Sequence, residues 1–445
     1  MPILDKKAYL QKVLEFTSAQ LHKKNLDAFE INCSYDQGHA VSVRDQLTET
    51  LEFNVTQQMS VTVYHHGKTG YAETSDLSEK SILAIIDNAK TIATYTENDP
   101  FCGVVDKKFL CTPQEMPSLY KPIADFSIHH LIEHAKNCEH IALKHKGIDH
   151  SEGVDIDSFE ILHGFANSHG FLHVYPETRH SLGIGLIAKD QHGMQRDSAY
   201  FSAHDFAALP NIHEITQLAI KRTLDRRNPR RIKSQKLPIL LSPSIARSFW
   251  GALMSAIKGQ RQYHKDTFLL NKVGHQILPT SISLIENPYI HNALGNQPFD
   301  DEGVNFGENP IVIEGVLKRY LLSSYSARQL NLETTGNSGG MSNLLVQSKE
   351  RLIEHDQLIK QLDKGIIVHE TMGQGFNLTT GDYSQGAMGY YVEKGEIQYP
   401  IDNFTIAGNL NAMFQDIIAI GNDIEPFSRI RSGSVLINQC SISGE

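Results

Sequence analysis

Three residues with metal-binding chemistry, His130, Glu133 and His134, form the pattern H-x-x-E-H in the segment 128–140. In zinc hydrolases, two histidines on one helical face hold the ion and a glutamate takes a proton from the metal-bound water. The order found here is the inverted form of a zinc peptidase signature. The spacing therefore raises the hypothesis that the chain carries its own zinc site on a helix.

The position of these histidines on the helix argues against that hypothesis. The apolar residues of the segment recur at helical spacing and define one stripe, made of Ile128, Leu131, Ile132, Ala135, Cys138 and Ala142. At about 100° per residue, His130 and His134 fall on the opposite side, so we expect them to face solvent. Catalytic zinc is normally held in a concave site. We interpret the motif as part of a solvated helix in a chain with 22 histidines. A self-sufficient zinc hydrolase using His130, Glu133 and His134 is kept as an alternative.

Other catalytic signatures are absent or incomplete. His213 and Glu214 begin an H-E-x-x-H match, but Gln217 occupies the position of the second histidine. The chain has no G-x-x-x-x-G-K-[ST] phosphate loop. Metal-dependent or nucleotide-dependent chemistry is therefore not predicted from local motifs.

Two loops contain polar residues that could contact a ligand. Asn337 begins the sequence N-S-G-G, which could form an anion-binding nest, although turn glycines are the commoner explanation. Asp382 and Tyr383 follow Gly381 at a turn signal and would lie between two strands. A hairpin corner and a binding loop are both consistent with this second pattern.

The composition excludes some classes of function. The 445 residues include 41 Lys and Arg against 51 Asp and Glu, a formal charge of -10, which disfavours a nucleic-acid partner. No apolar run of about eighteen residues occurs, so no membrane segment is expected. The five cysteines are scattered without a C-x-x-C pair, and the N-terminal segment lacks a signal-peptide pattern. These features predict a cytoplasmic protein and argue against a thiolate zinc site.

The hydrophobic periodicity predicts an α+β fold with two domains. Residues 1–230 should form an N-terminal α/β domain in which helices cover an antiparallel sheet. Its expected elements are a helix at 5–25, strands at 28–74, helices at 78–96 and 128–142, strands at 153–206, and a helix at 212–228. Residues 231–445 should form a C-terminal β-rich layered domain, because glycine-rich strands dominate after one helix at 244–259. Gly259 is expected to be the C-cap of that helix.

Three long blocks in the C-terminal third are more distinctive than any catalytic motif. These blocks, at residues 320–340, 380–400 and 404–425, closely resemble the TldD/PmbA family, and specifically its PmbA branch, also called TldE. Shorter matching blocks upstream, such as M-Q-R-D-S-A-Y and P-F-D-D-E-G-V, extend the resemblance over essentially the whole chain. The resemblance implies a cytoplasmic bacterial protein with two domains, the second dominated by β-sheet.

The resemblance also implies a partner and a metal outside this chain. In that family, a PmbA-like chain pairs with a TldD-like chain to form a metallopeptidase. The pair trims leader peptides and degrades unfolded polypeptides in an enclosed cavity. The zinc ligands belong to the TldD-like member, which has H-E-x-x-x-H on the helix after the first strand of its C-terminal domain and a cysteine near its C-terminus. Zinc is therefore expected on the partner.

The present sequence departs from this pattern at the metal-binding positions. Trp250, Gly251 and Ser255 stand where the His, Glu and His of the family motif would be. The cysteine position is occupied by Ser432 or Gly433. An indole offers only a donor N–H, glycine has no side chain, and a hydroxyl is a poor zinc ligand beside imidazole or thiolate. No zinc site can be transferred to this chain by the resemblance.

We therefore expect this chain to be a PmbA-like subunit that lacks catalytic residues and binds no metal itself. It would shape the substrate cavity for a TldD-like partner, and the isolated chain could form a homodimer instead. A glycine-rich β wall suits an extended peptide, which can add main-chain hydrogen bonds to a strand edge. The residues expected to line the cavity are Asn337, Asp382 and Tyr383. A non-enzymatic binding or regulatory protein is the second alternative.

Overall fold

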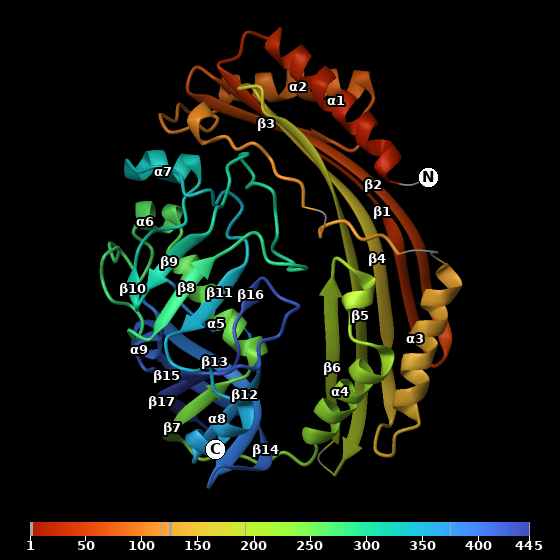
Figure 1. The fold of residues 1–445 in the computed structure, drawn as a ribbon, viewed down its shortest axis with the longest axis vertical. Helices are drawn as coiled ribbons and strands as arrows, with labels where there is room; N and C mark the ends of the chain where they lie inside the picture. The colour runs from red at the N-terminus through yellow and green to blue at the C-terminus, as the bar shows by residue number, and fades with distance from the viewer. Residues whose placement is uncertain (1–2, 117, 124–126, 192, 374, 445) are drawn as a thin grey trace.

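The computed structural model describes residues 3–116, 118–123, 127–191, 193–373 and 375–444. A long curved sheet from the N-terminal half arches around a body formed by the C-terminal half (Figure 1). The mixture of helices and sheets confirms the predicted α+β class. Among the described residues, none of the helices combines the length and the apolar character that crossing a bilayer requires.

The curved sheet contains six antiparallel strands. They are β1 (Ala28–Arg44), β2 (Leu47–His65), β3 (Lys68–Thr74), β4 (His150–Asn167), β5 (Leu172–Asp190) and β6 (Gly193–Ala203). They pair in the order β3-β2-β1-β4-β5-β6. The short outer strands cover only part of their neighbours, because β3 pairs with residues 59–65 of β2 and β6 pairs with residues 180–190 of β5. Among the described strands, β5 is therefore the outer strand of the sheet over residues 172–177.

Four helices cover the convex face of this sheet. They are α1 (Leu4–His22), α2 (Glu79–Tyr95), α3 (Ile128–Leu143) and α4 (Ile212–Asp225). The first two pack over one end and the last two over the other end (Figure 1). Alternation of side chains explains why one face is buried. In β1, Phe29, Ile31 and Cys33 point toward the helices and are buried, whereas the residues between them point to the concave face.

The C-terminal body contains two further sheets. The larger one has the strands β7 (Gln235–Leu241), β12 (Gly365–Met372), β13 (Asp382–Glu393), β14 (Glu396–Asn409), β15 (Ile417–Ile420) and β17 (Val435–Ser443). Its order is β14-β13-β12-β7-β17-β15, and an additional pairing joins β14 to β17. The smaller sheet has the strands β8 (Ile282–Glu286), β9 (Asn309–Ile313), β10 (Val316–Leu317), β11 (Leu344–Ser348) and β16 (Ile430–Arg431), in the order β10-β9-β8-β11-β16.

Helix α5 (Pro243–Ala256) lies in the main hydrophobic core of this body. Its buried residues are Ala246, Phe249, Trp250, Ala252, Leu253, Met254 and Ala256. These residues occupy most of the helix circumference, as expected for a helix enclosed by other elements. The remaining helices of the body are short and lie at α6 (Gly259–His264), α7 (Ser324–Leu330), α8 (His355–Leu362) and α9 (Leu410–Gln415).

The expected C-cap role of Gly259 is wrong. Helix α5 ends at Ala256, and Gly259 is the first residue of α6. Its backbone N–H donates to the carbonyl oxygen of Leu321 at 2.9 Å. A Cβ at this position would lie 2.5 Å from side-chain atoms of Leu322 and Ser326. Glycine is therefore required for the close approach of two segments and not for a left-handed helix end.

Candidate functional site

Two positions that the resemblance relates to zinc ligands, Trp250 and Ser432, lie together in this chain. Trp250, in the middle of α5, is completely buried, and Ser432 beside β16 is 2% exposed. The indole Nε1–H donates to Ser432 Oγ at 2.9 Å. The Ser432 hydroxyl in turn donates to the carbonyl oxygen of Gly433 at 2.9 Å. This hydrogen-bonded pair offers a metal neither an imidazole nitrogen nor a thiolate.

Aromatic packing fills the surroundings of Trp250. Phe414 of α9 stacks on Phe249 with a centroid distance of 4.1 Å and on Trp250 with a distance of 6.0 Å. The nearest atom to a Cβ built on Gly251 would be Ile430 Cδ1 at 3.9 Å, and Ser255 is half-buried. Dispersion and burial of apolar surface stabilise such a cluster. The region is a packed core and not an open catalytic site.

The H-x-x-E-H motif lies on α3. His130 and Glu133 are exposed, as the helical stripe predicts, while His134 is half-buried and its ring lies 6.1 Å from that of Phe206. The two imidazole Nε2 atoms are 3.2 Å apart. Burial, followed by the charge of His130, lowers the pKa of His134. Within the described chain, no third Asp, Glu, His or Cys joins this pair in a group that could hold an ion.

One buried residue of α3 has a structural role that the sequence pattern did not show. Glu139 is fully buried, and its carboxylate accepts the backbone N–H groups of Asp45 and Gln46. These two residues form the turn between β1 and β2 and have φ values of 50° and 63°. The carboxylate therefore fixes a hairpin turn whose conformation is unfavourable for most side chains.

The three residues predicted to line the cavity lie in different surroundings. Asn337 is 6% exposed and donates through Nδ2 to both carboxylate oxygens of Glu286, at 3.0 and 3.1 Å. Tyr383, also 6% exposed, belongs to the core of the C-terminal body. Asp382 is exposed at the start of β13 and accepts a hydrogen bond from the hydroxyl of Thr380 at 2.7 Å. Asp382 alone of the three presents its side chain to solvent, and the cavity assignment stays a prediction.

A polar cleft of about 260 Å³ lies between the concave face of the N-terminal sheet and the C-terminal body. The sheet contributes the side chains of Asn32, Ser34, Gln58, Ser60, His163 and Tyr175. The opposite wall comes from Gln297, Phe299, Asp300 and Asp301. Local motifs could not reveal this cleft, because its residues come from four strands and one distant loop. The available signal was the alternation of β1, β2, β4 and β5, in which polar residues occupy the face opposite the helices.

Two carboxyl groups at the cleft have pKa values shifted in opposite directions: Glu177, which contacts the lining residue His163, and Asp300, which lines the cleft itself. On the sheet, His163 Nε2 lies 2.9 Å from Glu177 Oε2, and Arg179 lies 3.1 Å from the other oxygen. Although burial acts in the other direction, the hydrogen bond from His163 and these charges lower the pKa of Glu177 to about 2. On the loop, burial and the charge of Glu302 raise the pKa of Asp300 to about 7. A carboxyl group that can be protonated near neutral pH therefore lines the cleft, and a permanent carboxylate lies beside it.

A second hollow of about 430 Å³ adjoins the polar cleft, because Tyr175 lines both. It is mainly apolar, with Leu4, Met116, Leu119 and Pro298 in its wall. His173 and Pro176 of β5 also line it, within the part of β5 that forms the outer edge of the sheet. An extended peptide could therefore place its main chain along a strand edge and its side chains in one polar and one apolar hollow.

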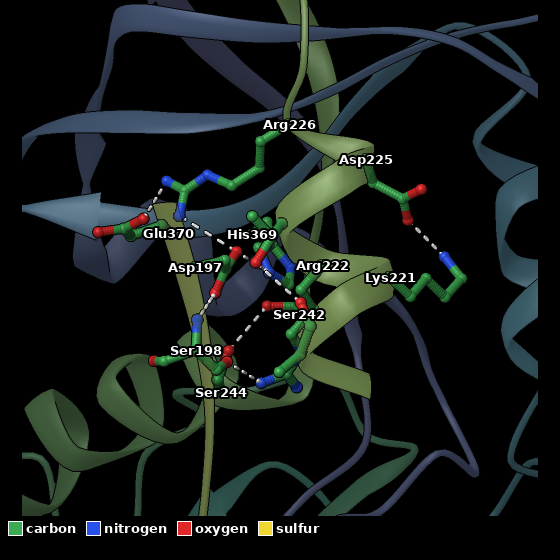
Figure 2. Close-up of polar contacts among 12 residues, drawn as sticks. Asp197, Ser198, Lys221, Arg222, Asp225, Arg226, Ser242, Ser244, His369 and Glu370 are labelled. Carbon is green, nitrogen blue, oxygen red and sulfur yellow. Dashed lines mark hydrogen bonds and ion pairs between the residues drawn. The ribbon is translucent and has the colours of Figure 1, made fainter. Parts of the chain in front are cut away.

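A charged cluster connects the curved sheet to the C-terminal body (Figure 2). Arg226, at the end of α4, forms ion pairs with Asp197 of β6 at 3.1 Å and with Glu370 of β12. His369 Nε2 lies 3.4 Å from the same carboxylate of Asp197. Although burial raises the pKa of Asp197, the hydrogen bond from His369 and the charge of Arg226 lower it overall. These contacts fix the relative position of the two parts that enclose the cleft.

Three family domains match the chain. The PmbA/TldA metallopeptidase domain 1 matches residues 29–93, the central domain matches residues 121–227, and the C-terminal domain matches residues 234–444. The chain is 38% identical to Metalloprotease PmbA of Escherichia coli O157:H7, over 100% of this chain and 99% of that protein. It is 34% identical to a Metalloprotease PmbA homolog of Haemophilus influenzae, over 98% of this chain and 96% of that protein.

Solved structures have the same fold. A protein of Bacteroides thetaiotaomicron superposes with a TM-score of 0.91 at 24% identity, covering 98% of both chains. TldE from Thermococcus kodakarensis superposes with a TM-score of 0.85 at 19% identity, covering 97% of this chain and 100% of the other. At these identities the superpositions establish the fold alone.

Proposed function

Because the chain belongs to the PmbA/TldD metallopeptidase family, we propose that it is the non-catalytic subunit of a two-chain cytoplasmic peptidase. The catalytic zinc belongs to a TldD-like partner. This chain completes the substrate cavity and presents an extended polypeptide to that partner. Leader peptides and unfolded polypeptides are the proposed substrates.

The hydrogen bond between Trp250 and Ser432 carries this proposal. Positions that would supply an imidazole and a thiolate are instead occupied by an indole and a hydroxyl that satisfy each other at 2.9 Å. Phe249 and Phe414 close the space around them. Installing a metal here would require removal of a completely buried aromatic side chain. We therefore assign peptide-bond hydrolysis by a bound zinc to another chain.

The concave side of the sheet supports a substrate-holding role. The outer edge of β5 at residues 172–177 can pair with an extended chain, and main-chain pairing gives affinity with little demand on sequence. The adjoining polar and apolar hollows can accept alternate side chains of such a strand. This combination suits substrates that are unfolded and varied in sequence.

Reconstitution of the two-chain enzyme tests which chain carries out hydrolysis. The purified chain, a TldD-like chain, and an equimolar mixture are each incubated with an unfolded polypeptide, and new peptide termini are quantified. We expect cleavage by the mixture and none by this chain alone. In the mixture, replacing the glutamate of the partner's H-E-x-x-x-H by Gln should abolish cleavage, whereas Ser255→Ala in this chain should leave it unchanged.

A different result would support the alternative of a self-sufficient hydrolase. Cleavage by this chain alone that is lost on chelation and in His134→Ala would overturn the proposal. Failure of the two chains to associate in analytical ultracentrifugation would also overturn it. The matched control is His213→Ala, which removes an exposed histidine of α4 that forms no part of either hypothesis.

A further inference from the structure

Three potential metal ligands from different parts of the sequence meet at the tip of the β2–β3 hairpin. Asp27, His65 and His66 each offer one ligand atom, and these atoms all lie within 4.8 Å of one another. Within the described chain this is the only group of three His, Cys, Asp or Glu residues with such spacing. It lies outside the cleft and outside α5.

The pairing of β1 with β2 brings these residues together. Asp27 directly precedes β1, and its backbone N–H donates to the carbonyl oxygen of Tyr64 at 3.0 Å. His65 is the last residue of β2, and His66 forms the turn to β3 with Gly67. The φ values of 53° and 70° at these two turn residues are those of a tight hairpin connection. The turn therefore places two imidazoles beside the carboxylate that begins the neighbouring strand.

The carboxylate is already oriented for a ligand. One oxygen of Asp27, Oδ2, accepts the backbone N–H of His66. This bond restricts rotation of the side chain and leaves the second oxygen available. A hydrogen-bonded carboxylate of this kind is typical of metal sites, where surrounding donors fix the position of each ligand.

His65 provides a second, independent observation. Its Nδ1 atom is buried and has no hydrogen-bond partner among the described residues, although the side chain as a whole is half-buried. Buried polar atoms nearly always have a partner, so an unpaired imidazole nitrogen beside a carboxylate fits a ligand-binding role. The rings of His65 and His66 have centroids 4.0 Å apart, which brings a second imidazole to the same place.

We propose that Asp27, His65 and His66 bind one divalent transition-metal ion, with zinc as the preferred ion. Two imidazoles and one carboxylate form a donor set that suits zinc, nickel or cobalt better than magnesium or calcium. Zinc bonds of about 2.0–2.2 Å require ligand atoms roughly 3.4 Å apart in a tetrahedron. Small side-chain rotations bring these atoms together, and solvent fills the fourth position beside the exposed Asp27 and His66.

The site lies next to a contact between the hairpin and the C-terminal body. The carbonyl oxygen of Gly67 accepts the backbone N–H of Asp99 at 2.7 Å. The Asp99 carboxylate accepts the hydroxyl of Tyr325 on α7 at 2.7 Å. An ion at the hairpin tip would therefore fix one end of the curved sheet where it meets the body. Its role is structural, and the proposal does not depend on the proposed function.

Calorimetry with zinc chloride alone tests the proposal on full-length chain that has been treated with a chelator and dialysed. The chain also carries the His130 and His134 pair, so His130→Ala is the matched control. We expect one zinc per chain, with affinity reduced by more than about tenfold in Asp27→Asn and in His66→Ala and unchanged in His130→Ala. Asp27→Asn keeps an acceptor for the His66 N–H, so a folding defect is not the expected cause. Magnesium chloride should produce no binding heat.

A second readout is the melting temperature with and without zinc. Zinc should raise it in the wild-type chain and in His130→Ala, and should leave it unchanged in His66→Ala. Binding of equal affinity in all variants would mean an adventitious ion only, and absence of saturable binding would also overturn the proposal. Metal analysis of the two-chain peptidase should use Asp27→Asn, so that zinc on the hairpin is not counted as catalytic zinc.

Discussion

The core around α5 and the cleft on the concave face of the sheet differ in the surroundings of their polar groups. At α5, Trp250 and Ser432 satisfy each other, and aromatic rings exclude water. In the cleft, polar residues such as Asn32, Gln58 and His163 line a space of about 260 Å³. One region is thus closed by packed aromatic side chains, whereas the other leaves polar side chains along an open space. This contrast fits the proposed role of the chain as a substrate-holding subunit.

Trp250→Ala should produce the largest change, because it removes the biggest fully buried side chain of the molecule. Large-to-small changes at buried aromatic residues cost about 3–5 kcal/mol. Denaturant unfolding followed by circular dichroism measures the loss. A loss of less than about 1 kcal/mol in the free energy of unfolding would show that the region is loosely packed. The contrast between a packed core at α5 and an open cleft would then no longer hold.

Glu30→Gln tests whether the buried carboxyl group of Glu30, beside the cleft, has a raised pKa. Burial raises the pKa of Glu30 to about 7, and the hydrogen bond from Tyr64 only partly offsets this effect. The folded state therefore retains a proton that the unfolded chain releases near pH 4.5. Stability from this group is present below pH 4.5 and is lost as pH rises through about 7.

The Gln variant should accordingly be more stable than the wild type at pH 8, by about 1–3 kcal/mol, and similar at pH 5. Gln keeps an acceptor for the Tyr64 hydroxyl, which donates to Glu30 at 2.9 Å. Unfolding curves at both pH values provide the measurement. Equal stability differences at pH 5 and pH 8 would show that the carboxyl group has an ordinary pKa.

Ser60→Trp should block the cleft without disturbing the core. Ser60 lies on the concave face of β2 and lines the cleft, so an indole there would occupy the space of a bound peptide. We expect kcat/KM of the reconstituted peptidase to fall by about tenfold, equivalent to about 1.4 kcal/mol. Thr56→Trp is the matched control, because Thr56 is exposed on the same strand outside the cleft. Equal activity of the two variants would exclude this cleft as a substrate site.

Ser432→Ala should have the smallest effect on peptide cleavage. It leaves the Trp250 indole N–H buried without an acceptor, which costs about 1–2 kcal/mol. Peptide cleavage by the two-chain enzyme should remain unchanged. Loss of cleavage with normal stability would indicate that Ser432 participates in catalysis, which would contradict the assignment of α5 to the core.

Helical periodicity correctly predicted the exposure of side chains where that exposure is set by residues close together in the sequence. The apolar stripe of α3 correctly placed His130 and Glu133 on the exposed side, because every side chain of a helix is positioned by its own backbone. The same argument did not place His134, which is half-buried because Phe206 comes from a separate segment. Ser432 and Trp250 were related only through a family resemblance, since 182 residues separate them.

Loop composition did not predict how the side chains of the two candidate loops are packed. Asn337 and Tyr383 belong to segments with turn residues, yet both side chains are buried, Asn337 by its hydrogen bonds to Glu286 and Tyr383 by core packing. Turn propensity describes the backbone and does not specify what the side chain contacts. A motif search also cannot relate Asp27 to His65, because only the strand register that pairs Ala28 with Tyr64 brings them together.

The position of β7 has a consequence for how the protein is made. This strand lies between β12 and β17, so its two neighbours are translated long after it leaves the ribosome. The curved N-terminal sheet consists mostly of consecutive hairpins and can assemble during synthesis, whereas the C-terminal body must wait for β17. Such non-local pairing slows folding and exposes unpaired strands. Co-translational protection of residues 235–241 by a chaperone would therefore have its greatest effect on this half of the protein.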